Sequence, residues 1–327
     1  MKSVVQTPSG YAEFLAGMKS RIRGAQVRAS LAVNRELVML YWSLGRDILL
    51  RQQNEGWGAR VIERLSHDLQ AEFPGVEGFG ARNLKYMRAV AEAWPDEAIV
   101  QSLNAQLPWN HTVRILDRTN DPETRDWYMR AAIENGWSQR ALIANLSSRL
   151  HERTGAAISN FARTLPPAES ALAREMLRDP YHFDFLTLDA DFKERELERG
   201  LLVHLRDLLM ELGRGFAFVG SQVPLVVGEE TFYLDLLFYH LRLRCYVVIE
   251  LKTGRFKPEY AGKLNFYLSA ADDLIRVEPD GPTLGLLLCE GTSGPVVEYA
   301  LRDVAKPIGV ASYRVTQVLP EPLRENL

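Results

Sequence analysis

The chain is poor in cysteine: Cys245 and Cys289 are the only two among 327 residues. Both lie in apolar, strand-like runs, without a CxxC pair or a histidine at ligand spacing. A disulfide scaffold and a cysteine-based zinc site are therefore excluded. We interpret the two residues as buried thiols of a reducing compartment, and a cytoplasmic location is expected.

Long apolar runs are also missing. No run reaches the roughly 18–20 residues that a membrane-spanning helix needs, and the stretch MKSVVQTPSGYAEFLAGMKS lacks the apolar segment of a signal peptide. The sequence contains no P-loop, no GxGxxG and no HD-type pairing, which disfavours nucleoside and phosphatase chemistry. We expect no membrane partner.

The net charge of −3 is small but unevenly distributed. Residues 1–165 hold 21 Lys and Arg against 17 Asp and Glu (+4), and residues 166–327 hold 18 against 25 (−7). Eighteen of the 21 basic residues in the first half are Arg, the side chain best suited to forked phosphate contacts. A solvated helical surface would show the same balance, so charge alone does not establish nucleic-acid binding.

The first half has the periodicity of helices. Apolar residues recur at helical spacing over 11–52, and shorter helices are predicted at 59–73, 81–94, 109–118, 122–134 and 138–152, separated by Gly- and Pro-containing turns such as EGWG at 55–58. Pro122 suits a first helical turn and Ser138 an N-cap. These residues predict an all-α N-terminal domain over 1–165.

Beyond Pro166-Pro167 the pattern changes to short β-type runs, which predicts a second domain over 166–327. A helix at about 191–213 precedes four runs (FAFVG, QVPLVV, TFYLDLLFYH, CYVVIEL), a helix at 258–273, and the strands TLGLLLCE and PIGVASYRV. Hairpin strands followed by a crossover helix are typical of a mixed α/β sheet flanked by helices.

Three charges interrupt the apolar runs of this domain: Asp235, Glu250 and Lys252. If 231–240 pairs antiparallel with 245–252 around a turn between Arg242 and Leu243, opposed residue numbers sum to 485, and Asp235 faces Glu250. Two facing carboxylates repel unless a proton or cation lies between them. Mg²⁺ takes one or two carboxylates plus substrate phosphate, so the pattern indicates phosphodiester hydrolysis, with the Lys252 ammonium offsetting developing negative charge.

The spacing alone is a weak signal and favours a structural ion-pair cluster. Its context adds specificity, because the segments LGRGFAFVGSQ, FYLDLLFYHLRLRCYVVIELKTGRFKPEYAGKLNFYLSAADD, LGLLLCE and KPIGVASY resemble the YhcG-type family of PD-(D/E)XK, restriction-endonuclease-like nucleases. In the first half, YWSLGRDI, GWGARVIERLSHDLQAEFP, NLKYMRAVAEAWP, NGWSQ and DPYHFDFL resemble the helical domain of the same family. Leu234 stands where the strict motif has Pro.

The resemblance implies a metal-dependent nuclease, with Asp235 and Glu250 as ligands of Mg²⁺ (or Mn²⁺) and Lys252 as the catalytic lysine. Related nucleases often add a helical Glu, for which Glu194, Glu196 and Glu198 are candidates and Glu198 is preferred. Two further polar residues are candidates for the catalytic site, Gln222 and Lys263. A sheet-edge hydrogen bond would equally explain Gln222.

In the first half, Arg82, Lys85 and Arg88 recur every third residue of 81–94 and share one helix face. With the helix before them they resemble a helix-turn-helix, whose basic second helix would contact nucleic acid, DNA rather than RNA; a helix bundle or a protein-interaction surface explains the pattern as well. The resulting hypothesis is a metal-dependent nuclease, for which paired cuts in a duplex would favour a homodimer. The alternative is a non-cleaving nucleic-acid-binding or protein-interaction module.

Overall fold

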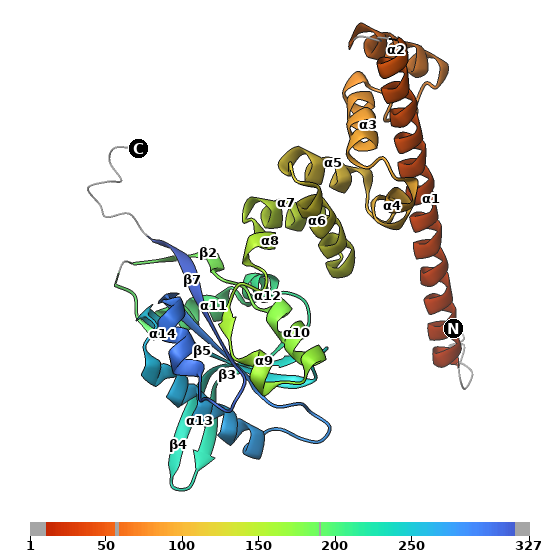
Figure 1. The fold of residues 1–327 in the computed structure, drawn as a ribbon. Coiled ribbons are helices and arrows are strands. Elements are labelled where there is room, and N and C mark those ends of the chain that lie inside the picture. Colours follow the sequence, from red (N-terminus) through yellow and green to blue (C-terminus); the bar gives the residue numbers. More distant parts are fainter. Residues whose placement is uncertain (1–10, 56–58, 190, 318–327) are drawn as a thin grey trace. The chain divides into compact units, whose positions relative to one another are not determined.

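A computed structural model describes residues 11–55, 59–189 and 191–317 (Figure 1). The chain divides into two compact units, Met1–Ser147 and Ser148–Leu327. From sequence we placed the boundary between 165 and 166. The structural division falls earlier because Ile158–Ser159 pairs with the last strand of the C-terminal sheet. Within the described residues no helix is both long and apolar enough to cross a membrane.

The N-terminal unit is helical, as predicted. Its elements are α1 (Tyr11–Glu55), α2 (Ala59–Glu72), α3 (Ala81–Ala93), α4 (Glu97–Ser102), the 3₁₀ turn η1 (Asn104–Gln106), α5 (Trp109–Arg118), α6 (Pro122–Asn135) and α7 (Gln139–Ser147). Pro122 opens α6, and the Ser138 hydroxyl accepts a hydrogen bond from the N–H of Ala141, so both predicted helix starts are confirmed. The break predicted at 55–58 falls mostly outside the described residues.

Helices α1 and α3 pack closely in this unit. Gly45 makes this possible, because a Cβ there would lie 2.0 Å from the carbonyl oxygen of Met87. Val38 and Trp42 are buried on the same side of α1, and the Trp42 indole N–H donates to the Trp94 carbonyl at 2.8 Å. This contact anchors the C-terminal half of α1.

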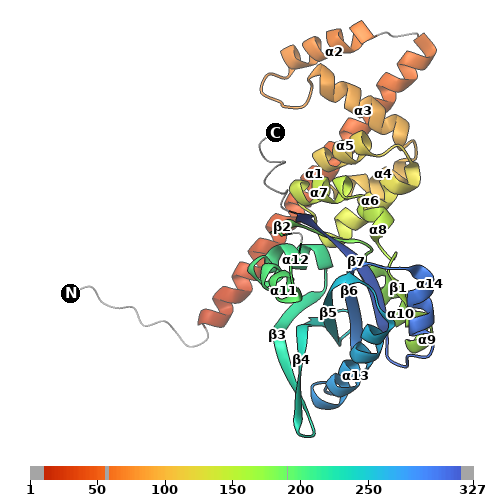
Figure 2. The ribbon, with the colours of Figure 1, turned by 90° about the vertical axis from the view of Figure 1, so that its left-hand side faces the viewer.

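The C-terminal unit is built around a mixed sheet. Its helices are α8 (Leu150–Arg153), α9 (Phe161–Thr164), α10 (Pro167–Met176), α11 (Glu194–Val203), α12 (Leu205–Leu212), α13 (Pro258–Leu274) and α14 (Gly294–Leu301). Its strands are β1 (Ile158–Ser159), β2 (Tyr181–Leu188), β3 (Phe216–Val227), β4 (Glu230–His240), β5 (Cys245–Arg255), β6 (Leu284–Gly291) and β7 (Ile308–Gln317). The strand order is β1-β7-β6-β5-β4-β3, with β2 paired to β7 (Figure 2).

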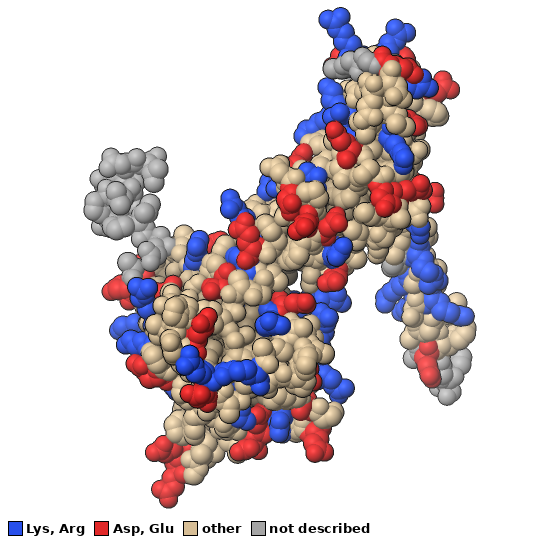
Figure 3. Space-filling model, viewed as in Figure 1, with Lys and Arg blue, Asp and Glu red and all other residues tan. Residues whose placement is uncertain are grey.

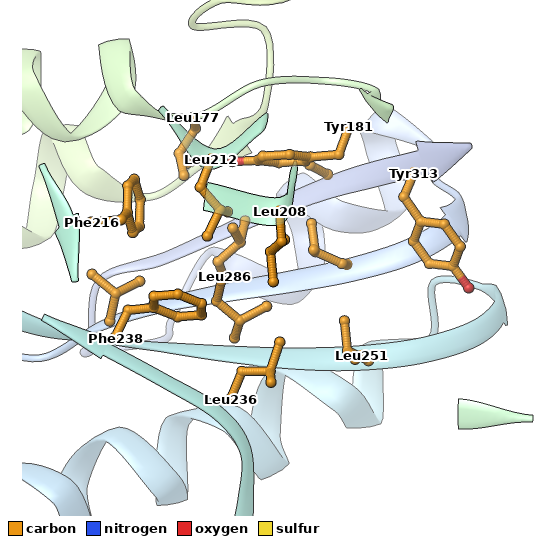
Figure 4. Packing of buried hydrophobic residues seen from close by; sticks show 14 of the residues in the cluster. Leu177, Tyr181, Leu208, Leu212, Phe216, Leu236, Phe238, Leu251, Leu286 and Tyr313 are labelled. Atoms are coloured by element: carbon orange, nitrogen blue, oxygen red, sulfur yellow. The ribbon is translucent and has the colours of Figure 1, made fainter. Parts of the chain in front are cut away.

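The strand directions follow from the connections. Strands β3, β4 and β5 are joined by tight turns and run antiparallel, whereas helices α13 and α14 connect β5, β6 and β7 as parallel strands. The sheet is covered on both faces, each by an apolar cluster. Helices α11 and α12 contribute to one cluster, and helices α13 and α14 contribute to the other. Figure 4 shows the first cluster, in which Leu208 and Leu212 of α12 approach Leu236 and Leu286 of the sheet.

Several predicted boundaries were wrong. FAFVG and QVPLVV form one strand, β3. A bulge between Phe218 and Gly220 accommodates one extra residue, so the pairing with β4 continues beyond it. The helix predicted at 191–213 is two helices that meet at His204, and the helix predicted at 138–152 is likewise divided into α7 and α8. The segment YHFDFL, assigned to the helical domain, forms β2 because β7 provides a parallel partner.

Candidate active site

The β4–β5 hairpin places two of the predicted residues together. Leu236 pairs with Ile249 and His240 with Cys245, so opposed numbers sum to 485, and the predicted register is confirmed. The turn lacks Gly and closes with Arg244 at φ 52°. Just beyond the last pair, the Asp235 carboxylate accepts the Leu251 N–H at 2.9 Å. Asp235 is therefore held against the end of β5.

Glu250 and Lys252 follow on β5 and are nearly fully enclosed, with exposed fractions of 1% and 5%. The Lys252 Nζ lies 3.1 Å from Glu250 Oε1, as expected for residues on one strand face. Lys263, from α13, contacts the same oxygen at 2.6 Å. The structure thus brings three of the predicted side chains into direct contact and adds Asp235 beside them.

Gln222 connects a second glutamate to this group. Its side-chain N–H donates to Glu198 Oε2 at 2.8 Å and lies 3.4 Å from Asp235 Oδ1. Its backbone φ is +48°, which is rare for a residue with a side chain and is frequently associated with functional sites. Gln222 therefore contacts two site carboxylates, which a sheet-edge hydrogen bond alone would not explain.

The three glutamates of α11 have different contacts. Glu194 Oε2 accepts from Lys252 Nζ at 3.0 Å, and Glu198, one turn later, reaches Gln222. Glu196 instead caps the start of α11 by accepting the Lys193 N–H. The contact between Glu194 and Lys252 was not predicted from sequence, although the spacing of 194 and 198 indicates that they share a helix face.

Burial dominates the electrostatics of the site. It raises the pKa of Asp235 to about 6, with Glu250 contributing in the same direction. Burial also raises the pKa of Glu198. For Lys252 and Lys263 burial acts to lower the pKa, but neighbouring groups together more than offset it, Glu250 with Glu194 and Asp235 for Lys252 and Glu250 with Tyr267 for Lys263, so the pKa of both ammonium groups is raised. The site therefore holds two ammonium groups beside a carboxyl whose pKa lies above its ordinary value.

The donor set suits a divalent cation. The Oε2 atom of Glu250 is buried and finds no hydrogen-bond donor among the described residues, while Asp235 is directed to the same end of β5. No group of three or more His, Cys, Asp or Glu side chains gathers at a metal-binding distance within the described chain. Two carboxylates would be supplied, and Mg²⁺ typically takes one or two and retains several waters.

The basic residues predicted on α3 lie opposite its buried face, which Leu84, Met87 and Val90 form. Each has a local partner: Arg82 lies over the Tyr86 ring, the Lys85 Nζ is 3.9 Å from Glu63, and Arg88 is 3.6 Å from Glu92. Arg82 and Lys85 are exposed, whereas Arg88 is half-buried and also hydrogen-bonds to Gln52. Exposed ion pairs of this kind contribute little stability.

Further basic side chains lie on or next to the elements that carry the site but were not singled out from the sequence. Arg195 and Arg199 are exposed on α11, the helix that carries Glu194 and Glu198. Arg255, the last residue of β5, and Lys257, just before α13, are also exposed. The Tyr260 ring lies 5.7 Å from the Lys252 Nζ. These basic residues could have been found in the sequence from their position on or next to α11 and β5, the elements that carry Glu194, Glu198, Glu250 and Lys252.

Both units match known protein families. Residues 174–327 match the family described as "YhcG PDDEXK nuclease domain", and residues 17–153 match "DUF1016 N-terminal domain". The sheet and its carboxylates therefore lie in a domain of the PD-(D/E)XK nuclease class. The chain is also 30% identical to "Putative nuclease YhcG" of Escherichia coli (strain K12), over 97% of this chain and 93% of that protein. It belongs to the YhcG nuclease family, as the resemblance implied.

Two solved structures show more distant similarity. A repair endonuclease from Pyrococcus abyssi matches at 16% identity and a TM-score of 0.26, over 39% of this chain and 49% of that chain. A complex of EndoMS with double-stranded DNA matches at 15% identity and a TM-score of 0.26, over 42% and 49%. The chain spans about half the length of each, and the family match rather than these structures supports the assignment.

Proposed function

We propose that this protein is a nuclease that requires a divalent cation, Mg²⁺ or Mn²⁺, and hydrolyses phosphodiester bonds, those of DNA in preference to RNA. The observation that carries the proposal is the enclosed Glu250, whose Oε2 has no donor among the described residues and which stands beside Asp235 and two ammonium groups. A purely structural ion pair would be expected to satisfy both oxygens of a buried carboxylate.

Asp235 and Glu250 would hold the cation, and Glu198 would act beside them through Gln222. A bound Mg²⁺ would polarise a phosphoryl oxygen and acidify a bound water. The Lys252 ammonium is held by Glu194 and by the Leu251 carbonyl, at 3.0 and 2.7 Å. Because its pKa is raised, Lys252 would serve as a fixed positive charge that stabilises the attacked phosphate, and not as a general base.

Lys263 differs from Lys252 in its freedom to move. Its side chain is 47% exposed, so it has room to turn from Glu250 toward a substrate phosphate when a cation takes its place at that carboxylate. Exposed Arg195 and Arg199 on α11 would contact the neighbouring backbone of the substrate. Substrate binding would then combine these phosphate contacts with the metal-bound phosphate.

The test is cleavage of labelled single-stranded, duplex and branched DNA, and of RNA, in Mg²⁺, in Mn²⁺ and in a chelator. Asp235→Asn and Lys252→Ala are compared with Glu259→Gln, which changes an exposed carboxylate at the start of α13. We expect metal-dependent cutting of DNA that the first two variants abolish and the third retains. Absence of cutting on every substrate would refute the proposed nuclease activity and favour a non-cleaving binding module.

The preference for DNA draws on the N-terminal unit, where Arg82, Lys85 and Arg88 would contact phosphates. Replacing all three by Gln should weaken DNA binding similarly for every sequence and reduce the dependence of log K on log salt by up to about 3. Cleavage at saturating DNA should be unchanged. If the salt dependence of DNA binding, measured by fluorescence anisotropy, is unaltered, then α3 does not contact the DNA phosphates.

A further inference from the structure

Helix α1 carries a second apolar face that the N-terminal unit does not cover. Its members are Tyr11, Leu15, Met18, Ile22, Val33, Leu37 and Leu40, here called the α1 stripe. They form two groups with spacings of three or four residues, which about three helical turns separate between Ile22 and Val33, and all lie within an arc of about 100°. All except Leu15 are among the exposed large apolar side chains of the structure. The α1 stripe extends for about 44 Å along the helix.

The packed face of α1 points in another direction. It comprises Val38, Trp42, Gly45 and Ile48 and begins only after the first half of the helix. Among the described side chains between Tyr11 and Val33, none is buried. A helical segment of this length is marginal in water without an apolar face packed against a neighbour. Gly17 and Gly24 each lower the stability of this helical segment by about 1 kcal/mol relative to Ala.

The spacing fits pairing with another helix. Tyr11, Leu15, Met18, Ile22 and Ala25 follow at intervals of 4, 3, 4 and 3, the seam of a heptad repeat. The six exposed apolar side chains and the half-buried Leu15 on each of two helices would bury on the order of 1,200 Å² in total, the lower limit for a stable interface. The α1 stripe is thus long enough to hold two copies together.

The charges beside the seam select the partner and its direction. In a parallel pair, Arg21 would face Gln26 of the second copy, and Lys19 would face Phe14, so no like charges meet. In an antiparallel pair, the flank carrying Arg21 and Arg28 would face itself. Figure 3 shows the Lys and Arg side chains around this end of α1.

We propose that the α1 stripe is the self-association surface of this protein and pairs in parallel with the α1 stripe of a second copy of the chain. The resulting homodimer would carry two C-terminal units, an arrangement suited to paired cuts in a duplex. The pairing itself depends only on α1 and would hold whether or not the protein cleaves nucleic acid.

The full-length protein is tested by sedimentation equilibrium with two matched variants. Ile22→Glu places a charge in the α1 stripe, and Leu31→Glu makes the same kind of change on the opposite face of the helix. The two side chains are comparably exposed, at 52% and 54%. We expect a wild-type dimer, self-association weakened at least about 100-fold by Ile22→Glu, and no effect of Leu31→Glu. A monomeric wild type, or equal loss in both variants, would overturn the proposal.

A cross-link tests the direction. Cys245 and Cys289 are buried, so a cysteine introduced on α1 is readily distinguished. Met18→Cys lies in the seam and should form an intermolecular disulfide under mild oxidation, whereas Ser20→Cys, on the far side of the helix, should not. Failure of Met18→Cys to cross-link a protein that is dimeric would refute the parallel arrangement.

Discussion

Asp235→Asn should stabilise the metal-free protein at alkaline pH. Burial first, and the Glu250 carboxylate second, raise the pKa of Asp235 from its ordinary value of 3.8 to about 6. A carboxyl whose pKa is higher in the folded than in the unfolded chain opposes folding once it ionises. The penalty is absent below about pH 4, grows as the pH rises and is complete above about pH 6. Asn carries no charge and avoids it.

The size of the effect follows from the shift. A change of about two pKa units corresponds to roughly 3 kcal/mol, and an Asn oxygen can still accept the Leu251 N–H. We therefore expect a gain of about 1–3 kcal/mol at pH 8, or roughly 3–10 °C in the melting temperature of the C-terminal unit. The assay is thermal unfolding in a chelator at pH 8 and at pH 4, where the gain should vanish.

Asp303→Asn is the matched control, because Asp303 is an exposed carboxylate of the same unit. It should change the melting temperature at neither pH. The reasoning would be refuted if Asp235→Asn lost about 3–5 kcal/mol at pH 8, the cost of leaving a buried partner charge unpaired. Asp235 would then belong to a structural ion-pair cluster, and the interaction-protein hypothesis would be favoured.

Three further outcomes are expected. Lys252→Met should lower the single-turnover cleavage rate by about 10²–10³ through loss of a fixed charge at the phosphate, while circular dichroism shows an unchanged fold. Glu211→Ala should destabilise the C-terminal unit by about 3–5 kcal/mol in chemical denaturation, because it leaves the enclosed Arg153 and Arg178 guanidinium groups without their shared carboxylate. Mg²⁺ at 100 times its dissociation constant should stabilise the wild type by about 2.7 kcal/mol, and a chelator should reverse this; no stabilisation would contradict a cation site.

Local patterns predicted much of this structure. A tight turn assumed between Arg242 and Leu243 was sufficient for the hairpin register, because the turn centre fixes which residues of the two strands oppose each other, and the observed pairs agree with it. Likewise, Pro122 and Ser138 mark helix starts through chemistry within one turn of the chain.

Features that depend on distant segments were not predictable in this way. Strand β2 exists because β7, far along the chain, pairs with it. The contact of Glu194 with Lys252 depends on how α11 lies against the sheet, which the spacing of charges on one helix does not specify. The position of Gln222 also required the bulge in β3, which brings it beside Asp235.

The most direct test is the single-turnover cleavage rate of the wild type against Glu250→Gln in saturating Mg²⁺. This substitution keeps the size of the enclosed side chain and removes the charge that would hold the cation. We predict loss of cleavage together with loss of calorimetric Mn²⁺ binding, in a protein that remains folded. Undiminished cleavage by Glu250→Gln would contradict the assignment of this carboxylate, and with it the active site described here.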